Sequence, residues 1–174
     1  MIKKLFLGIS LDEQQRQKIR QLQNSFDSDV RLVPINNLHM TLAFFGLVSS
    51  KTQRKLEKRI SALHKPPFSV TLNQLAHWKK PKILCLTGET KDKALLQIAK
   101  ECQLLAADLN LPHSEHVFRA HITVARKAHQ IPQSPAPRQR FKPLLIKPNE
   151  IHLFESKSSG SSVEYQIIRS WPLH

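Results

Sequence analysis

The chain has 174 residues, of which 40% are hydrophobic and 23% charged, and this size and composition are typical of one soluble globular domain. No apolar run reaches the ~20 residues of a membrane-spanning helix. The four glycines form neither a Walker loop nor a dinucleotide fingerprint. The 27 Lys and Arg residues against 13 Asp and Glu give a net charge of +14. Such an excess favours a polyanionic partner such as nucleic acid, although lysines on solvated faces that merely aid solubility would give the same count.

The first half of the chain predicts three strands and two helices. The apolar segment that precedes Ser10 predicts the first strand. The capping pattern Ser-x-x-Glu begins at Ser10 and is followed by apolar residues at helical spacing, which predicts a helix over residues 11–26. A second capping pattern begins at Ser50 and predicts a helix that ends near Pro66. Between these helices, strands are expected over residues 30–33 and 38–45.

The second half predicts mainly strands, with one broadly apolar and therefore buried helix over residues 92–109. The strands are expected near residues 68–76, 82–88, 120–126, 142–147, 149–155 and 163–169. Because strands and helices do not alternate strictly, the sequence predicts an α+β architecture with antiparallel sheets rather than a doubly wound parallel sheet. Cys85 and Cys102 lack the spacing of a metal site or a disulfide framework, which predicts two buried thiols in a reducing cytoplasm.

The interval from Ile131 to Pro143 holds four of the chain's eleven prolines. It also holds Arg138, Arg140 and Lys142. Prolines interrupt both helices and central strands, so this interval is expected to be a surface loop, with its basic side chains as a positively charged lip.

Two tetrads in the sequence share the order histidine, apolar, threonine, apolar. They are His39-Met40-Thr41-Leu42 and His121-Ile122-Thr123-Val124. Residues i and i+2 of a strand face the same side of a sheet, so each tetrad offers one imidazole and one hydroxyl together. The apolar residues between them would anchor the opposite face in a core. Two such strands side by side in a cleft would bring two imidazoles and two hydroxyls to one point.

This set of side chains suits phosphoryl chemistry. The ordinary histidine pKa is about 6.5, so one imidazole can accept a proton while the other, with its pKa shifted slightly upward, donates one. Threonine hydroxyls can donate to phosphate oxygens. The alternative is structural, since a single histidine in an apolar strand is more often a half-buried residue with satisfied hydrogen bonds. The occurrence of two matched tetrads favours the functional interpretation.

The tetrads, their spacing and the flanking stretches 37–46 and 118–126 resemble the two-histidine phosphoesterase superfamily. Within it they are most similar to the RNA 2′,3′-cyclic phosphodiesterase branch, historically called the 2′-5′ RNA ligase family. The resemblance covers nearly the whole chain, because residues 6–9 resemble its opening strand and residues 165–173 its closing strand. It implies a single bilobal α+β domain over residues 1–174 with pseudo-twofold symmetry, in which two antiparallel sheets flanked by helices surround a central cleft.

The resemblance also implies roles for the tetrads. His121 would be the general base that removes a proton from water, and His39 the general acid that protonates the departing ribose oxygen. Thr41 and Thr123 would bind the phosphate, and the product would be a 2′-phosphomonoester. No metal or cofactor is expected, since the sequence has no paired carboxylates to hold Mg²⁺. The expected partner is RNA with 2′,3′-cyclic phosphate ends, tRNA fragments among them, and the enzyme is expected to act as a cytoplasmic monomer.

The chain departs from the family pattern near the second tetrad. The family usually has proline just before the second histidine, where this chain has Ala120. His116 replaces an arginine often found five residues before that histidine, and Arg119 is another possible source of its contact. Arg126 matches the family pattern, but simple strand alternation places it on the face opposite His121, where a structural ion pair is at least as good an interpretation as a phosphate contact.

Other candidate sites carry less weight. His113 and His116 flank Glu115 in an expected loop, without the regular spacing of metal ligands. No Gly-x-Ser-x-Gly elbow supports a serine nucleophile. Three aromatic residues are able to stack on a base, but each lies in an apolar strand pattern that favours core packing. These are Trp78, Phe118 and Phe6.

Two further functions stay open at this point. Reversible 2′-5′ RNA ligation would use the same groups in the opposite direction, with a 5′-hydroxyl in place of water. A non-catalytic basic RNA-binding domain would keep the charge and the sheet but would need neither His39 nor His121. Substitution of each histidine discriminates between them, because a binding domain should keep its RNA affinity while an enzyme should lose turnover.

Overall fold

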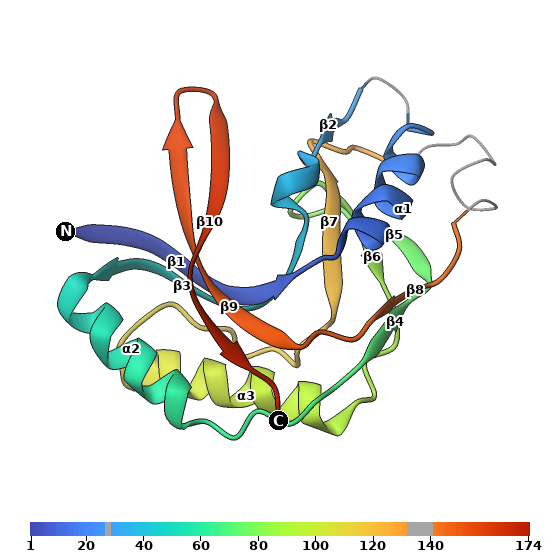
Figure 1. Cartoon of the computed structure of the whole chain (residues 1–174). Helices are drawn as coiled ribbons and strands as arrows, with labels where there is room; N and C mark the ends of the chain where they lie inside the picture. The colour runs from blue at the N-terminus through green and yellow to red at the C-terminus, as the bar shows by residue number, and fades with distance from the viewer. Residues whose placement is uncertain (27–28, 132–140) are drawn as a thin grey trace.

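The computed structural model describes residues 1–26, 29–131 and 141–174 of the chain, which form helices and antiparallel strands (Figure 1). In chain order the elements are β1 (Ile2–Ser10), α1 (Glu13–Gln23), β2 (Arg31–Leu32), the 3₁₀ turn η1 (Ile35–Asn37), β3 (His39–Ser49), α2 (Ser50–Ala62), β4 (Val70–Leu72), β5 (Gln74–Trp78), β6 (Ile83–Thr87), α3 (Lys93–Asp108), β7 (His121–Arg126), β8 (Leu144–Ile146), β9 (Glu150–Ser159) and β10 (Ser162–Pro172).

Most strands belong to one eight-stranded sheet with the order β10-β9-β1-β3-β7-β6-β5, in which β2 also pairs with β7. The strands β4 and β8 form a separate two-stranded sheet. All paired strands within the described residues are antiparallel. The predicted α+β architecture with antiparallel sheets is therefore confirmed. The link between β3 and β7 in the middle of the large sheet consists of a single register pair, Met40 with Ile122.

The helices cover the sheet and close the core. In Figure 1, α2 and α3 lie next to each other against β3, and α1 lies against β7. The apolar faces of all three helices are buried in one hydrophobic cluster with the strands. Cys85 and Cys102 are free and buried as predicted, and burial raises the pKa of each thiol to about 12. Neither thiol is therefore reactive near neutral pH.

No helix in the described parts of the chain is long and apolar enough to span a bilayer.

Two helix starts differ from the sequence prediction. Ser10 does not cap α1, because it stays in β1, where it pairs with His39. Asp12 caps the helix instead and forms a reciprocal pair of hydrogen bonds with Gln15. The second helix is capped by Ser49, one residue before the predicted cap. Both predicted helices also end earlier than expected, at residues 23 and 62.

The strand predicted over residues 68–76 divides between two sheets, since β4 pairs with β8 while β5 pairs with β6. The other predicted strands and the helix over 92–109 match observed elements to within a few residues. The basic lip predicted for 131–143 lies mostly in residues 132–140, outside the described residues.

Gly8 allows an unusually close approach of β1 to β3. The register between these strands skips Leu42, so β3 has a bulge there. A Cβ atom on Gly8 would lie 2.6 Å from the carbonyl oxygen of Met40, closer than real contacts allow. Any other residue at this position would push β3 away at the point where the first tetrad lies.

Candidate active site

The sheet places the two tetrads next to each other. His39 begins β3 and His121 begins β7, and these strands are antiparallel neighbours paired at Met40 and Ile122. Both central apolar residues are fully buried, whereas both histidines and both threonines are partly exposed. The predicted alternation is therefore confirmed. The antiparallel direction sets His39 toward Thr123 and Thr41 toward His121 across the strand pair.

The first histidine is held in one tautomer by the backbone. Nδ1 of His39 lies 2.6 Å from the carbonyl oxygen of Asn37, which can only accept, so Nδ1 carries the donated proton. Nε2 of His39 lies 3.1 Å from the Thr41 hydroxyl oxygen. Nε2 is therefore the nitrogen left for proton transfer.

The second histidine has the same arrangement. Nδ1 of His121 donates to the carbonyl oxygen of Arg119 at 2.9 Å, again two residues earlier in the chain. Its Nε2 is thus also left free for chemistry. The two tetrads match in their burial pattern and in the hydrogen bond that orients each imidazole.

Aromatic rings surround both imidazoles. The ring of Phe6 lies 4.8 Å from that of His39, and the ring of Tyr165 lies 4.9 Å from it at 82°. The ring of Trp78 lies 4.4 Å from that of His121 and carries the guanidinium of Arg119 at 5.2 Å. The predicted core packing is confirmed for Phe6, which is buried, whereas Trp78 is only partly buried; each ring also contacts a tetrad histidine. A strand pattern shows which residues are apolar but not which distant ring they meet.

Asn37 links the first tetrad to β10. Its side-chain Nδ2 donates to the carbonyl oxygen of Val163 at 2.6 Å, and its Oδ1 accepts from the backbone N–H of Tyr165 at 3.3 Å. Asn37 is buried, and its own carbonyl oxygen holds His39. One residue thus ties the orientation of the imidazole to the strand that carries Tyr165. The sequence reasoning missed this role, because no local pattern reports it.

Burial lowers the pKa of both tetrad histidines. For His39 the pKa falls to about 4, mainly by burial and further by the positive charges of Arg126 and His121, although the hydrogen bond to Asn37 raises it. For His121 burial is again the largest cause and the Arg119 charge adds to it, against the opposing hydrogen bond. The predicted slight upward shift of one histidine is therefore wrong for the free protein. Both imidazoles are neutral at pH 7.

Arg126 lies on the same face as the second tetrad, which corrects the prediction from simple alternation. The register of β7 with β6 skips Val124, so a bulge shifts the alternation by one residue. Val124 and Ala125 are both buried, and the exposed Arg126 follows them. None of the ion pairs formed within the described residues includes Arg126. Its charge is close enough to His39 to lower the pKa of that imidazole.

Ala120 fixes the start of β7 through its backbone. The N–H of Ala120 donates to the Thr90 hydroxyl at 3.1 Å, and its carbonyl oxygen accepts from the Thr87 hydroxyl at 2.9 Å. Proline would have no N–H for the first of these bonds. Two side-chain hydrogen bonds therefore hold the strand entry at the position where the family pattern has proline.

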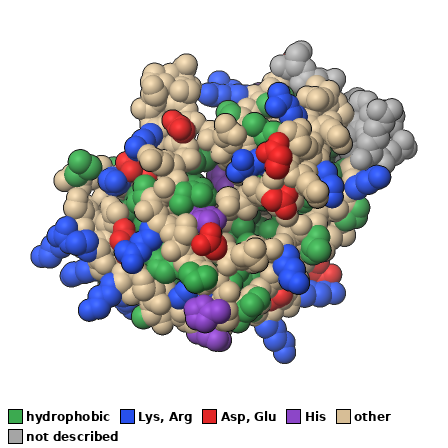
Figure 2. All heavy atoms as spheres, viewed as in Figure 1, with side chains coloured by type: hydrophobic (Ala, Val, Ile, Leu, Met, Phe, Trp, Pro, Cys, Tyr) green, Lys and Arg blue, Asp and Glu red, His purple; other side chains and the backbone are tan. Residues whose placement is uncertain are grey.

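Two cavities adjoin the tetrads. The larger, of about 1150 Å³, is lined by Thr41 and His121 together with Trp78, Phe118 and Arg119, and its walls are mostly apolar. The smaller, of about 300 Å³, is lined by His39, Asn37 and Tyr165. Figure 2 shows histidine side chains in a hollow near the middle of one face, with Lys and Arg side chains around the outline of the molecule.

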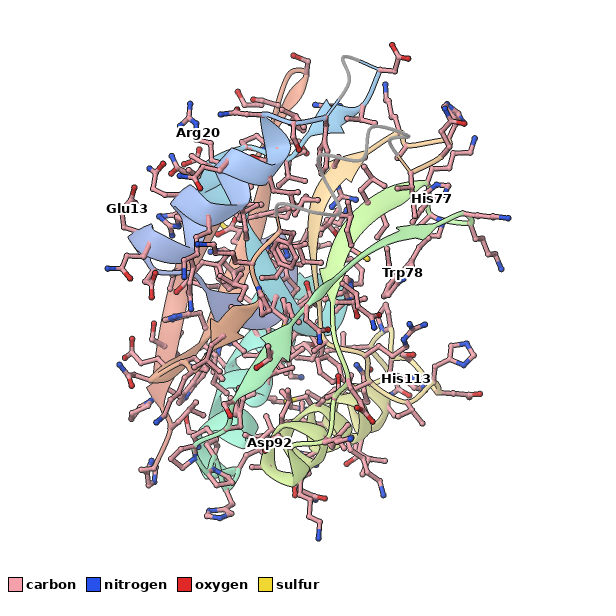
Figure 3. The ribbon with its side chains drawn as sticks, turned by 90° about the vertical axis from the view of Figure 1, so that its right-hand side faces the viewer. Glu13, Arg20, His77, Trp78, Asp92 and His113 are labelled. Carbon is pink, nitrogen blue, oxygen red and sulfur yellow. The ribbon has the colours of Figure 1, made fainter. Side chains whose placement is uncertain are left out.

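The segment with His113 and His116 borders the larger cavity. In Figure 3, His113 lies on the same side of the molecule as Trp78. Within residues 1–26, 29–131 and 141–174, no group of three or more His, Cys, Asp or Glu side chains is arranged to hold a metal ion. His116 is exposed at the rim, where it replaces the arginine of the family pattern.

Comparisons with known proteins find similar sequences and structures over nearly the whole chain. Residues 9–85 match the family model described as LigT like Phosphoesterase. The RNA 2′,3′-cyclic phosphodiesterase of Escherichia coli (strain K12) is 27% identical over 172 residues, which cover 98% of this chain and 96% of that protein. The crystal structure of E. coli LigT complexed with 3′-AMP has a TM-score of 0.88 at 25% identity, with 99% of both chains covered. The fold is also that of TT0787 of Thermus thermophilus, with a TM-score of 0.77 at 21% identity and 98% and 97% of the two chains covered. The chain is therefore similar to the LigT-like phosphoesterases over nearly its whole length, and residues 9–85 carry the match to the family model.

Proposed function

We propose that this protein hydrolyses the 2′,3′-cyclic phosphate ends of RNA to 2′-phosphomonoesters without a metal ion. One observation carries the proposal: two imidazoles with matched Nδ1–H hydrogen bonds to backbone carbonyls lie on neighbouring strands and both present Nε2 for proton transfer. Two threonine hydroxyls and Arg126 lie on the same face. This is the set of groups needed to transfer two protons and to hold a negatively charged phosphate.

The proposed reaction is a single displacement. Nε2 of His121 removes a proton from water, and the hydroxide oxygen forms a bond to phosphorus. The bond between phosphorus and the ribose 3′ oxygen breaks, and that oxygen takes the proton from Nε2 of His39. Thr41 and Thr123 donate to the non-bridging oxygens, and Arg126 balances their charge. The two histidines end with exchanged protonation states, and solvent restores them.

The low pKa of His39 is consistent with a general acid that gains its proton as the substrate binds. In the free protein its imidazole is neutral at pH 7, because burial and the charge of Arg126 disfavour the cation. The negative charge of a cyclic phosphate placed beside it acts in the opposite direction. Substrate binding would therefore be coupled to proton uptake by His39.

The substrate proposal is supported by the charge and by the relatives. The E. coli relative carries the name RNA 2′,3′-cyclic phosphodiesterase, and the net charge of +14 favours a polyanion. We propose RNA ends, with tRNA fragments as one source, as the substrate of a monomeric enzyme in the cytoplasm. In the same proposal, the halves of the sheet on either side of the β3–β7 pair act as two matched lobes, each of which supplies one tetrad.

The test is an assay with a short oligoribonucleotide that ends in a 2′,3′-cyclic phosphate, run in the presence of EDTA and followed by phosphorus NMR. We expect loss of the cyclic phosphate signal and appearance of a 2′-phosphomonoester, identified against authentic 2′- and 3′-monophosphate standards. The same oligonucleotide with a 3′-hydroxyl end should stay unchanged. Predominant formation of a 3′-phosphate would mean that His39 and His121 have the opposite roles or that the sugar binds in the opposite orientation. No turnover at all would remove the proposal.

Reversible 2′-5′ RNA ligation is a second candidate, favoured by the size of the cavity next to His121. A volume of about 1150 Å³ leaves room for a nucleoside whose 5′-hydroxyl replaces the attacking water. Incubation of the cyclic-ended RNA with a second RNA that carries a 5′-hydroxyl would then give a longer product with a linkage resistant to 3′-5′-specific nucleases. A non-catalytic RNA-binding domain, the third possibility, predicts unchanged RNA affinity and no turnover for any variant.

A further inference from the structure

A small cavity beside His39 is not used by the displacement itself. Its volume is about 300 Å³, and it lies between the first turns of α1, the η1 turn and β10. The side chains of Arg16, Asn36 and Gln166 line it together with His39 and Tyr165. The larger cavity, in contrast, is lined by Thr41 and His121. A phosphate held between the two histidines would therefore have one cavity on each side.

Arg16 is the cationic side chain, apart from His39, that lines this small cavity. Its Nε is the only buried side-chain nitrogen or oxygen without a hydrogen-bond partner in the part of the chain that the structure describes. The ion pairs formed by the described residues do not include Arg16. Glu164 also borders the cavity but is exposed and does not come within ion-pair distance of the guanidinium. A guanidinium that lines a cavity and has no carboxylate partner leaves its charge available to an anion held there.

The position of the cavity identifies the anion. The general acid His39 lies beside the leaving ribose oxygen, so the terminal ribose occupies this side of the site. An RNA chain continues from that ribose through its 5′ oxygen to the preceding phosphodiester. We propose that the cavity beside His39 binds this preceding phosphodiester and that Arg16 is its cation. The inference rests on the proposed function and adds a preference to it, since a cyclic mononucleotide has no such phosphodiester.

The test compares three substrates: a dinucleotide with a 2′,3′-cyclic end, the same dinucleotide with a neutral methylphosphonate linkage, and a nucleoside 2′,3′-cyclic phosphate with a free 5′-hydroxyl. The wild-type protein should show the highest kcat/KM for the natural dinucleotide. In Arg16→Gln, the ratio of kcat/KM for the dinucleotide to that for the mononucleotide should fall by about 10- to 100-fold, mostly through KM, as expected for a lost charged hydrogen bond. In the wild type, kcat/KM should be lower for the methylphosphonate than for the natural dinucleotide. In Arg16→Gln, kcat/KM should be nearly the same for these two substrates, because the cation that distinguishes them is absent.

Arg20→Gln is the matched control, because Arg20 lies one turn further along α1 and projects outward from it in Figure 3. It should keep the wild-type ratio, and melting temperatures of both variants should show that they are folded. If the wild type hydrolyses none of the substrates, the proposed function fails and the subsite with it. The subsite alone is overturned if the wild type is active but has the same kcat/KM for the two linkages. It is also overturned if Arg16→Gln lowers kcat/KM equally for all three substrates.

Discussion

The side-chain amide of Asn37 donates to the carbonyl oxygen of Val163 at 2.6 Å, across 126 residues of sequence. The backbone carbonyl of the same asparagine orients His39. Asn37→Asp replaces the amide donor by an oxygen that faces the Val163 carbonyl, which should destabilise the fold by about 1–3 kcal/mol. It should also lower kcat more than it raises KM. The pH profile of kcat/KM should shift, because the orientation of the His39 imidazole changes. The same change at the exposed Asn73 should do neither. A stability loss with unchanged pH profile would leave Asn37 with a merely structural role.

Alanine at either tetrad histidine should remove a proton-transfer group. We expect His39→Ala and His121→Ala each to lower kcat on a cyclic-ended oligonucleotide by roughly 10² to 10⁴. The double variant should be little worse than either single variant, since the two groups act in one step. His64→Ala, at an exposed histidine far from the tetrads in sequence, serves as control. Full activity in a folded single variant would contradict the assignment.

The threonine hydroxyls should contribute less than the histidines. In Thr41→Ala and Thr123→Ala, the activation free energy should rise by about 1.5–3 kcal/mol, the value of one hydrogen bond to a charged group. Thr41→Ser, which keeps the hydroxyl, should retain most of the activity. The comparison of kcat/KM among these variants decides whether the hydroxyl or the methyl group matters, and equal losses in Ala and Ser would argue against phosphate binding.

Arg126 should influence both the substrate and His39. Arg126→Gln should lower kcat/KM by roughly 10- to 100-fold, as expected for the loss of one charge-assisted contact to phosphate. Because the Arg126 charge lowers the pKa of His39, its removal should also raise that pKa, measured by NMR titration of the imidazole. Lys127→Gln removes an exposed neighbouring charge as control. An Arg126→Gln protein with an unchanged His39 pKa would show that the guanidinium lies away from the site.

Stability should fall as the pH is lowered below 6.5. Burial lowers the pKa of His39 to about 4 and also lowers the pKa of His121 and His152. Between pH 6.5 and about 4, the unfolded chain binds protons that the folded protein excludes at His39, so folding loses up to about 3 kcal/mol from this residue alone. Below pH 4 that contribution stays constant. Urea unfolding at pH 7 and pH 4.5 measures this loss of unfolding free energy, and the loss should be smaller in His39→Asn. An equal loss in the wild type and in His39→Asn would contradict the burial argument.

Part of this site follows directly from the sequence. The period of two along a strand is a local rule, so the spacing of His39 and Thr41 is enough to place both on one face, and the same holds for His121 and Thr123. The α+β class likewise follows from the order of local patterns. These predictions depend on neighbours one or two residues apart.

The rest depends on partners that are distant in sequence. The bulge at Val124, which turns Arg126 toward the tetrad face, exists only because β6 pairs with β7 in that register. The low pKa of His39 results from burial under the rings of Phe6 and Tyr165, which come from opposite ends of the chain. No pattern within either tetrad reports these contacts.

The enclosure of His39 by β10 has a consequence for the protein during its synthesis. Ribosomes add about 5–20 residues per second, so Val163 follows Asn37 by roughly 6 to 25 s. During that interval, the nascent chain carries the complete first tetrad, but the strand that supplies Tyr165 and receives the Asn37 amide does not yet exist. A growing polypeptide that is itself surrounded by messenger and ribosomal RNA therefore acquires its active site only after the final hairpin has been translated.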